Sequence, residues 1–301
     1  MNQPVAILGT GDSGSAMARR LLQTGFPVRV WNRTTSRARP LADDGALICA
    51  TAAEAVRSTR VVVVTVFDTQ AVLDVLRHIA PALEPDTVVV QSATVGGEIT
   101  EVIETASRLD VPILDAPFLG NPGPAARGEL TLMVAGTRPH KVAATPVLEA
   151  LASHVVDVDD RPGRASLLKL VCNAWLFGMN AVAAQSAVLA EAFGLDPSLF
   201  IRAVTGTHAD SAYLHYRSAQ LTGRSEEALS PVHAAVKDLR HLRAASASAG
   251  VPDALLSTIQ EIYDRAGAAG LGDRDLASIR DVLAPVGETR RVHVDHSPSG
   301  E

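Results

Sequence analysis

Two stretches of the chain carry residues whose types and spacing could do chemistry, and the first is a glycine loop close to the start. The run Gly9-Thr10-Gly11-Asp12-Ser13-Gly14 has the spacing G-x-G-x-x-G and follows the apolar run Val5–Leu8. In such a loop the first glycine permits a tight turn, the second lets the backbone approach a pyrophosphate, and the third lets a helix pack on a strand. The N-terminus of that helix would offer free N–H groups to the phosphates. The run therefore predicts a dinucleotide site formed by Gly9, Thr10, Gly11, Asp12, Ser13 and Gly14.

The residues after the next apolar run, Val28–Trp31, predict which dinucleotide is preferred. An NAD site usually has Asp or Glu about 20 residues beyond the glycines, where it binds the ribose 2′-hydroxyl. Asn32 stands at this place, and it is followed by Arg33 and Thr34 and by further arginines at 37 and 39. No carboxylate would repel a 2′-phosphate there, and guanidinium groups bind phosphate through paired hydrogen bonds. We therefore expect NADP (NADPH) to be preferred over NAD; the alternative is a solvated basic loop without a ligand.

The second stretch is a polar stripe on a long apolar run. Lys169 and Asn173 are four residues apart and share a helix face, and Asn180 lies on nearly the same face further along. Buried polar groups are costly unless they are paired, which favours the wall of a cleft over a solid core. An ammonium group there could stabilise the charge that develops on a carbonyl oxygen as it receives a hydride, and then deliver a proton. The alternative is that Lys169 extends to solvent without a chemical role.

Strand and helix patterns alternate through the first half of the chain. Apolar runs typical of strands covered on both faces occur at Val5–Leu8, Val28–Trp31, Val61–Val66, Val88–Gln91 and Ile113–Asp115, with further strands at Leu130–Ala135 and Val155–Val158. Amphipathic helical segments lie between them at Ser13–Gln23, Thr69–Ile79 and Glu98–Leu109. This alternation predicts an α/β Rossmann domain with a doubly wound, mainly parallel sheet over residues 1–160.

Beyond Arg161-Pro162-Gly163 the pattern becomes helical, at Ser166–Phe193, Pro197–Val204, Pro231–Ser248 and Ala254–Ala268. We therefore predict an all-α substrate and oligomerisation domain over residues 161–287, connected to the first domain by the long helix. Residues 288–301 are polar and rich in His, Ser, Pro and Gly, which predicts a disordered tail.

Composition limits the class of protein. The chain has 301 residues, of which 47% are hydrophobic and 20% charged, enough for two globular domains. A net charge of −6 disfavours a nucleic-acid partner.

The start of the chain lacks the features of a signal peptide and Cys49 and Cys172 lack metal-ligand spacing, so we expect a cytoplasmic protein without a metal site. No apolar run approaches the roughly 20 residues that span a bilayer, so we expect no membrane partner. The longest run, residues 167–194, is interrupted by polar residues and predicts a buried core helix.

These residues together resemble the β-hydroxyacid dehydrogenases, which include 3-hydroxyisobutyrate dehydrogenases and glyoxylate/succinic semialdehyde reductases and to which the imine reductases are closely related. The similarity runs from Val5 to about Ile279. Its landmarks are the glycine loop, Trp31-Asn32-Arg33-Thr34, Asp115-Ala116-Pro117, Gly128-Glu129-Leu130-Thr131-Leu132, the pair Lys169 and Asn173, and Lys237-Asp238-Leu239. Several such landmarks at consistent spacing are more specific than any one of them.

The resemblance implies an active site between a Rossmann domain and a helical domain like that of 6-phosphogluconate dehydrogenase. It implies that Lys169 is the catalytic lysine and Asn173 the substrate-orienting asparagine, that Lys237 lies near nicotinamide and substrate, and that Thr94 lies beside the nicotinamide. We also assign Val66 and Phe67 to the dinucleotide site. Helical domains of this family commonly form oligomers, so a homodimer or homotetramer is expected.

The substrate loop departs from the family pattern. After Asp-Ala-Pro those enzymes usually have an aliphatic residue and then Ser-Gly-Gly, which binds the substrate carboxylate, whereas this chain has Phe118, Leu119, Gly120 and Asn121. Leucine cannot donate a hydrogen bond, so carboxylate recognition is weakened or moved to backbone N–H groups and Asn121. Ala93 likewise replaces a serine before Thr94. A bulkier or less acidic carbonyl substrate would suit this loop.

Three functions compete. The leading one is NADPH-linked reduction of a small aldehyde or ketone, such as a semialdehyde, or the reverse oxidation of a 3-hydroxy acid, with Lys169 as general acid or base. An imine reductase would share fold and cofactor, but those relatives commonly have Asp or Tyr where this chain has Lys169. A non-catalytic dinucleotide-binding protein is the third, against which Lys169, Asn173 and Lys237 argue. His233, Lys237 and His241 form a row at helical spacing that could line the cleft or face solvent.

Overall fold

The computed structural model describes residues 2–284, and its first half is built on one sheet. The strands of this sheet are β1 (Val5–Leu8), β2 (Val28–Trp31), β3 (Leu47–Ile48), β4 (Val61–Val64), β5 (Val88–Gln91), β6 (Ile113–Asp115), β7 (Phe118–Leu119), β8 (Leu130–Ala135) and β9 (Ala152–Asp159). They are ordered β3-β2-β1-β4-β5-β6-β8-β7, and β9 pairs with β8. The first six strands of this order are parallel, whereas β8 is antiparallel to β6 and β7. This is the doubly wound Rossmann order, and the fold predicted from the sequence is confirmed.

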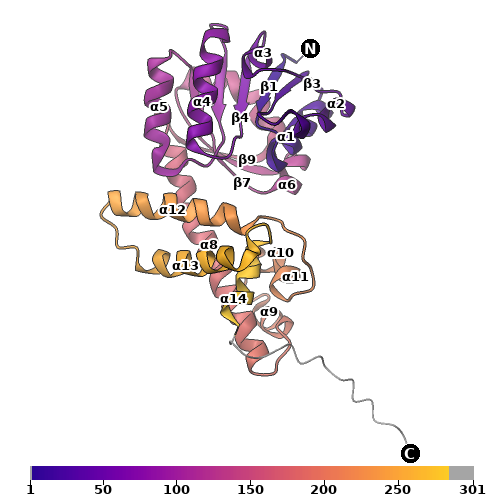
Figure 1. Ribbon diagram of the computed structural model, residues 1–301, viewed down its shortest axis with the longest axis vertical. Coiled ribbons are helices and arrows are strands. Elements are labelled where there is room, and N and C mark those ends of the chain that lie inside the picture. The colour runs from indigo at the N-terminus through magenta and orange to yellow at the C-terminus, as the bar shows by residue number, and fades with distance from the viewer. Residues whose placement is uncertain (1, 285–301) are drawn as a thin grey trace, which may run out of the picture. The chain divides into compact units, whose positions relative to one another are not determined.

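The parallel strands β1, β4, β5 and β6 are buried on both faces, and their side chains alternate between two apolar cores. Ile7 and Val63 belong to one core, which also contains residues of α1 (Asp12–Gln23), α6 (Pro122–Arg127) and α7 (Arg138–Leu151). Leu8 and Val64 belong to the other, which contains residues of α3 (Ala52–Val56), α4 (Thr69–Ile79) and α5 (Ile99–Arg108). Helices α4 and α5 lie side by side over that second face (Figure 1). The crossovers reverse between β1 and β4, so the loop after β1 lies at the topological switch point.

The second half of the chain is helical from Arg164 onward. Its helices are α8 (Arg164–Ala192), α9 (Ser198–Val204), α10 (Ala212–Tyr216), α11 (Ser218–Leu221), α12 (Val232–Ser248), α13 (Ala254–Ala266) and α14 (Arg280–Leu283). The remaining helix of the first half is α2 (Pro40–Asp43). The long helix predicted over Ser166–Phe193 corresponds to α8.

Helix α8 corrects one expectation from the sequence. By length and composition alone it is long and apolar enough to cross a membrane, a test that the core helix of a soluble protein also passes. It is also not buried on all sides, because Val171, Trp175 and Val182 are largely exposed. The expectation rested on the interruptions by Lys169, Asn173, Asn180, Gln185 and Glu191, but an 18-residue window within α8 is still apolar enough on average.

Contacts divide the described residues into two compact units, and the division differs from one at residue 160. The first unit contains the chain up to Phe177 together with Ala234–Gln260, and the second contains Gly178–His233 and the described residues from Glu261 on. The N-terminal half of α8 and most of α12 therefore belong with the Rossmann sheet. The domains predicted over 1–160 and 161–287 stay a prediction, and the tail predicted over 288–301 lies outside the described residues.

Some elements were not predicted, for identifiable reasons. β3 and β7 have two residues each, too few for an alternating pattern. Helix α7 contains Pro139 in its first turn and Pro146 in its interior, and proline normally marks the end of a helix. Predicted strand Val61–Val66 ends two residues earlier, at Val64, where the chain turns away toward α4.

Candidate active site

The glycine loop has the backbone geometry that the sequence predicts. Gly9 has φ +103°, and a Cβ there would lie 2.8 Å from the carbonyl oxygen of Thr65. A Cβ on Gly14 would lie 2.0 Å from the carbonyl oxygen of Gly9, so α1 can approach β1 only because this residue has no side chain. Gly11, in contrast, has no atom within 4 Å of a Cβ position. Protein atoms therefore lie close to the Cβ positions of Gly9 and Gly14, whereas the Cβ position of Gly11 faces open space.

The start of α1 fits a bound pyrophosphate. Its N-cap residue is Gly11, and no side chain caps the helix. The free N–H groups of the first turn and the dipole of the helix favour an anion there. The hydroxyl of Thr10 is buried and has no hydrogen-bond partner among the described residues. A dinucleotide therefore finds an open cradle, uncapped backbone donors and an unused hydroxyl at the same loop.

Asn32 and the arginines after it have different environments. The Asn32 Oδ1 accepts a hydrogen bond from the Thr10 N–H at 3.0 Å, and its Nδ2 donates to the carbonyl oxygen of Thr34 at 3.0 Å. Asn32, which the sequence places near the ribose, thus holds the glycine loop through its hydrogen bond with the Thr10 N–H. Arg33, by contrast, is exposed, and no ion pair or hydrogen bond of its guanidinium is found within residues 2–284. The same holds for the arginines at 37 and 39.

The polar stripe of α8 runs through Ser166, Lys169, Asn173 and Asn180, and three of these four side chains are buried and bonded. Ser166 donates to the carboxylate of Asp115, the last residue of β6, at 2.6 Å. The Asn173 Nδ2 donates to Oδ2 of Asp238 on α12 at 3.0 Å. The Asn180 Nδ2 donates to Tyr263 and to the carbonyl oxygen of Leu276, within the second unit. Asn180 is therefore part of a separate buried network and does not join the cluster around Lys169.

Lys169 is the exception in this stripe. It is partly buried, and its amine makes no hydrogen bond within the described part of the chain. Burial lowers the pKa of the Lys169 ammonium from its usual value, the negative charge of Asp238 opposes this change, and the positive charge of Lys237 adds to it. Lys169 is thus a desolvated amine beside one carboxylate, with its hydrogen-bonding capacity unused. Such a group can donate or accept a proton.

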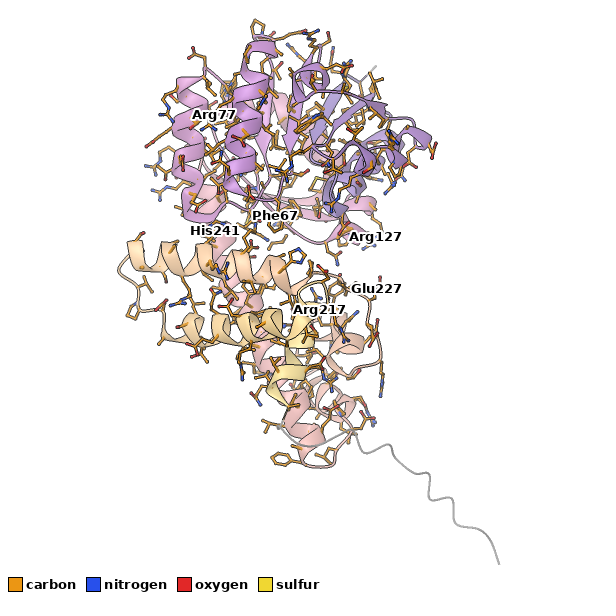
Figure 2. The ribbon with its side chains drawn as sticks, in the orientation of Figure 1. Phe67, Arg77, Arg127, Arg217, Glu227 and His241 are labelled. Carbon is orange, nitrogen blue, oxygen red and sulfur yellow. The ribbon has the colours of Figure 1, made fainter. Side chains whose placement is uncertain are left out.

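Lys237 is fully engaged by the Rossmann sheet. Its Nζ donates to the carbonyl oxygen of Phe67, after β4, at 3.0 Å and to that of Thr94, after β5, at 2.9 Å. It also lies 5.0 Å from the centre of the Phe67 ring and 3.1 Å from Oδ1 of Asp238. Figure 2 labels Phe67, in the loop after β4, and His241, on the helix α12 that carries Lys237. The amine of Lys237 thus joins the loops that follow β4 and β5, and the partly exposed Val66 lies in the first of these loops.

Glycine also permits the close approach of α12. Gly96 has φ +60°, and a Cβ on it would lie 2.5 Å from Cβ of His241. His241 is mostly buried here, with its ring 3.8 Å from a carboxylate oxygen of Glu98. His233 bonds to the carbonyl oxygen of Gly272 in the second unit. The row His233, Lys237, His241 therefore divides between two environments and does not act as one set.

The substrate loop after Asp115 is short of polar side chains. Leu119 packs on a small apolar cluster that contains Met133 and Ala165 and that Leu168 and Cys172 also contact. Gly120 has φ +130°, and a Cβ there would lie 2.6 Å from Leu130. The Asn121 Oδ1 accepts the Gly123 N–H at 3.2 Å and caps α6. The loop therefore presents an apolar wall beside the start of α8.

Asp238 and Asp115 are the residues that the sequence did not single out. Asp238 lies between Asn173 and two lysines, and Asp115 holds the start of α8. Both were visible only as parts of the motifs Lys237-Asp238-Leu239 and Asp115-Ala116-Pro117. A carboxylate next to a lysine on a mostly apolar helix is a usable signal, because a buried charge needs a partner.

A Rossmann sheet with a phosphate cradle, combined with a buried lysine on a long following helix, defines an NAD(P)-binding oxidoreductase. Residues 4–159 match the model of the NAD-binding domain of 6-phosphogluconate dehydrogenase, and residues 163–283 match the model described as NAD-binding of NADP-dependent 3-hydroxyisobutyrate dehydrogenase. The chain belongs to the β-hydroxyacid dehydrogenase family. It is thus an enzyme of the dehydrogenase and reductase class.

Individual relatives cover nearly the whole chain. The 3-sulfolactaldehyde reductase of Escherichia coli (strain K12) is 29% identical over 296 residues, which cover 96% of this chain and 98% of the relative. The crystal structure of a 3-hydroxyisobutyrate dehydrogenase from Salmonella typhimurium has a TM-score of 0.85 and 26% identity and covers 93% of this chain and 100% of that one. An imine reductase from Pseudomonas sp. has a TM-score of 0.64 at 24% identity, covering 94% and 100% of the two chains, a likeness of fold alone.

Proposed function

We propose that this enzyme uses NADPH to reduce a small aldehyde or ketone, or catalyses the reverse oxidation of a 3-hydroxy acid, with Lys169 as the proton donor and acceptor. One observation carries the proposal: Lys169 is the only member of its polar stripe whose polar group is left without a hydrogen bond among residues 2–284. Its neighbours Ser166 and Asn173 are pinned by protein partners, so the amine is held in place and kept available.

The chemistry follows from charge. When bound, the dinucleotide supplies the hydride for reduction and accepts it in oxidation. As the carbonyl carbon receives the hydride, negative charge develops on the oxygen, and an ammonium in a desolvated site stabilises that charge strongly before it delivers the proton. Asp238 keeps the ammonium form of Lys169 accessible despite burial. The hydrogen bond of Asn173 Nδ2 to Asp238 fixes this amide one helical turn after Lys169.

The residue types agree with this role. The chain has 24 arginines and only three lysines, and two of these lysines, Lys169 and Lys237, lie in this cluster. Arginine cannot lose its proton near neutral pH, whereas a buried lysine can. A site that needs only positive charge can use arginine, but a site that transfers a proton needs lysine. The third lysine, Lys141, forms ion pairs with Asp157 and Asp160 elsewhere in the first unit.

Preference for NADP is the second part of the proposal. Arg33 follows Asn32 with an exposed guanidinium that has no ion pair or hydrogen bond within residues 2–284, and two more arginines follow within six residues. Asn32 carries no charge that would repel a 2′-phosphate and holds the loop through Thr10. Free guanidinium groups next to a phosphate cradle favour the more highly charged dinucleotide.

For the substrate, we propose a small carbonyl compound in which a carboxylate is not required at the loop. Leu119 offers no hydroxyl, and the Asn121 side chain caps α6. The relative named 3-sulfolactaldehyde reductase acts, by its name, on an aldehyde with a sulfonate group. Semialdehydes, sulfonated aldehydes and aldehydes with apolar substituents are therefore the compounds to compare.

The proposal is tested by assaying a panel of these aldehydes, ketones and cyclic imines with NADPH and NADH, for wild type and for Lys169→Met. Methionine retains the length of the side chain and removes the amine. We expect wild type to reduce aldehydes with NADPH and the variant to lose about 10²–10⁴-fold in kcat with unchanged NADPH affinity. Lys141→Met is the matched control and should keep wild-type turnover. Full turnover of Lys169→Met would refute the proton-transfer role, and turnover of imines alone would identify an imine reductase.

If NADPH binds and no compound of the panel reacts, the chain is a dinucleotide-binding protein without this activity. A homodimer or homotetramer and a cytoplasmic location stay predictions; light scattering measures the first.

A further inference from the structure

The buried carboxylate of Asp115 joins two parts of the first unit that are distant in sequence. Asp115 ends β6 and is completely buried. Its Oδ2 accepts the N–H groups of Gly163 at 2.9 Å and Ser166 at 2.8 Å, and its Oδ1 accepts the Ser166 hydroxyl at 2.6 Å. All of these donors lie at the start of α8. The carboxylate therefore caps that helix from 48 to 51 residues away.

The partners of Asp115 suit a charged carboxylate. Burial raises the pKa of Asp115 to about 6, and the hydrogen bonds from Ser166 and Gly163 oppose that rise. The group is thus mainly ionised at neutral pH, when both oxygens can accept. Three hydrogen bonds to an ion in a dry site are each stronger than neutral ones and hold the helix start firmly.

This cap sets where Lys169 lies. Ser166, Lys169 and Asn173 follow one another along one face of α8, because residues three and four apart lie on the same side of a helix. Ser166 is fixed by Asp115 and Asn173 by Asp238, so the helix is held on both sides of Lys169. A slip of one residue would turn Lys169 by about 100° away from Asp238.

The same residue is the root of the substrate loop. Ala116, Pro117 and Phe118 follow Asp115 directly, and the Ala116 carbonyl oxygen accepts the buried Ser92 hydroxyl at 2.9 Å. On the helix side, Gly163 has φ +96°, and a Cβ there would lie 2.7 Å from the Ile103 side chain of α5, so glycine suits this turn. The loop and the helix start thus share one anchoring point.

We infer that Asp115 is a positioning residue, whose carboxylate holds the helix that carries Lys169 in register with the substrate loop. This inference rests on the proposed function, in which Lys169 transfers the proton and the loop faces the substrate. Within residues 2–284 the Asp115 carboxylate makes no hydrogen bond or ion pair with Lys169, and it acts through Ser166 and the first turn of α8.

The inference is tested with Asp115→Asn and Ser166→Ala. Asparagine keeps the shape but replaces one oxygen with an NH2 group, which would face the N–H donors of Gly163 and Ser166. Alanine at 166 removes only the hydroxyl donor and leaves both N–H bonds. The matched control is Thr87→Val, which removes a buried side-chain hydrogen bond to the Thr59 carbonyl oxygen at the start of β5, the opposite end of the sheet.

We expect a graded loss of kcat for carbonyl reduction, a few-fold for Ser166→Ala and about 100-fold for Asp115→Asn, because a displacement of about 1 Å in the reacting group has such effects. The KM for NADPH should stay within about twofold of wild type, since the glycine loop is untouched. Amide hydrogen exchange over residues 163–173 should become faster in the same order and stay unchanged in Thr87→Val.

Equal kcat losses in Asp115→Asn and Thr87→Val, at equal loss of thermal stability, would overturn the inference, as would unchanged exchange over residues 163–173. Should Asp115→Asn fail to fold, Ser166→Ala answers the same question. The exchange measurement is independent of activity. Faster exchange combined with full turnover of Lys169→Met would mean that the proposed function fails while Asp115 still holds the helix.

Discussion

The glycine loop and the cluster around Lys169 present their polar groups in opposite ways. The loop is made of six consecutive residues; α1 begins there without a side-chain cap, and the buried Thr10 hydroxyl has no hydrogen-bond partner among the described residues. The cluster is assembled from α8 and α12, where Asn173 and Asp238 are 65 residues apart. There the polar side chains are partly or fully buried, and the Lys169 amine makes no hydrogen bond within the described residues. In the proposed function, the loop would bind a ligand through backbone N–H groups, whereas the cluster would act through side chains that hydrogen bonds hold in place.

This difference has an energetic side. A helix N-terminus can bind an anion at the protein surface, because its N–H donors are already aligned and exchanging their water for the anion costs little free energy. Proton transfer benefits from a dry site, in which one charge changes the pKa of the next. Lys169, Asp238 and Lys237 form such a set, whereas Arg33 and its neighbours remain in water. Substitutions in the two regions should consequently fail in different measurements.

The largest effect is expected from glycine substitutions that separate packing from ligand approach. In Gly14→Ala the new Cβ would lie 2.0 Å from the Gly9 carbonyl oxygen, so α1 must move off β1. We expect a loss of about 3 kcal/mol or more in the free energy of unfolding and no measurable dinucleotide binding. In Gly11→Ala nothing lies within 4 Å of the Cβ, and the free energy of unfolding should stay within about 1 kcal/mol of wild type.

Gly11→Ala should nevertheless raise the Kd for NADPH at least about tenfold, because the methyl group occupies the approach path of the pyrophosphate. Thermal unfolding and fluorescence titration of both variants measure the two effects. Unchanged NADPH affinity in Gly11→Ala would show that the open space over this glycine is not the phosphate site.

The comparison also explains what could be predicted from the sequence. Strands β1, β2 and β5 match their predicted bounds residue for residue, and in β1 and β5 the reason is that a strand buried on both faces is nearly all apolar. The glycine loop was found for a similar reason, since its residues are consecutive. The polar stripe on α8 indicated buried, paired side chains, but the pattern could not identify the partners.

Those partners depend on tertiary structure. Asp115 approaches Ser166 because β6 ends where α8 begins, and Asp238 approaches Asn173 because α12 returns to the first unit. Neither approach has a periodic signature. Asn180 illustrates the converse, because it lies on the same stripe as Lys169 and yet bonds to Tyr263 in the second unit. Helix spacing shows which residues share a face but not what that face meets along its length.

A smaller effect is expected at the edge of the loop, from Arg33→Ala. Removing one charge-assisted hydrogen bond to phosphate costs about 1.5–3 kcal/mol, which corresponds to a rise of about 10–100-fold in the KM for NADPH. The KM for NADH should change by less than about twofold, because NADH lacks the 2′-phosphate. Arg77→Ala, on α4 and ion-paired with Asp74 (Figure 2), is the control and should change neither value. Equal changes for the two dinucleotides would count against the phosphate contact.

The smallest effect, and the one most specific to the buried cluster, is expected from Asp238→Asn. The amide can still accept the hydrogen bond of Asn173, but the negative charge beside Lys169 is lost. Burial and Lys237 already lower the pKa of Lys169 and Asp238 raises it, so the pKa of Lys169 must fall further in the variant.

Reduction needs the ammonium form of Lys169, and the kcat of reduction decreases as pH rises through this pKa. The alkaline limb of the reductive profile should therefore move to lower pH, whereas oxidation, which needs the neutral amine, should gain activity at lower pH. Asp86→Asn, which removes an exposed carboxylate paired with Arg60, should leave both profiles in place. If the reductive limb stays at the same pH in Asp238→Asn, Lys169 does not titrate in the measured step. The cluster around Lys169 would then act by positioning the substrate and not by proton transfer.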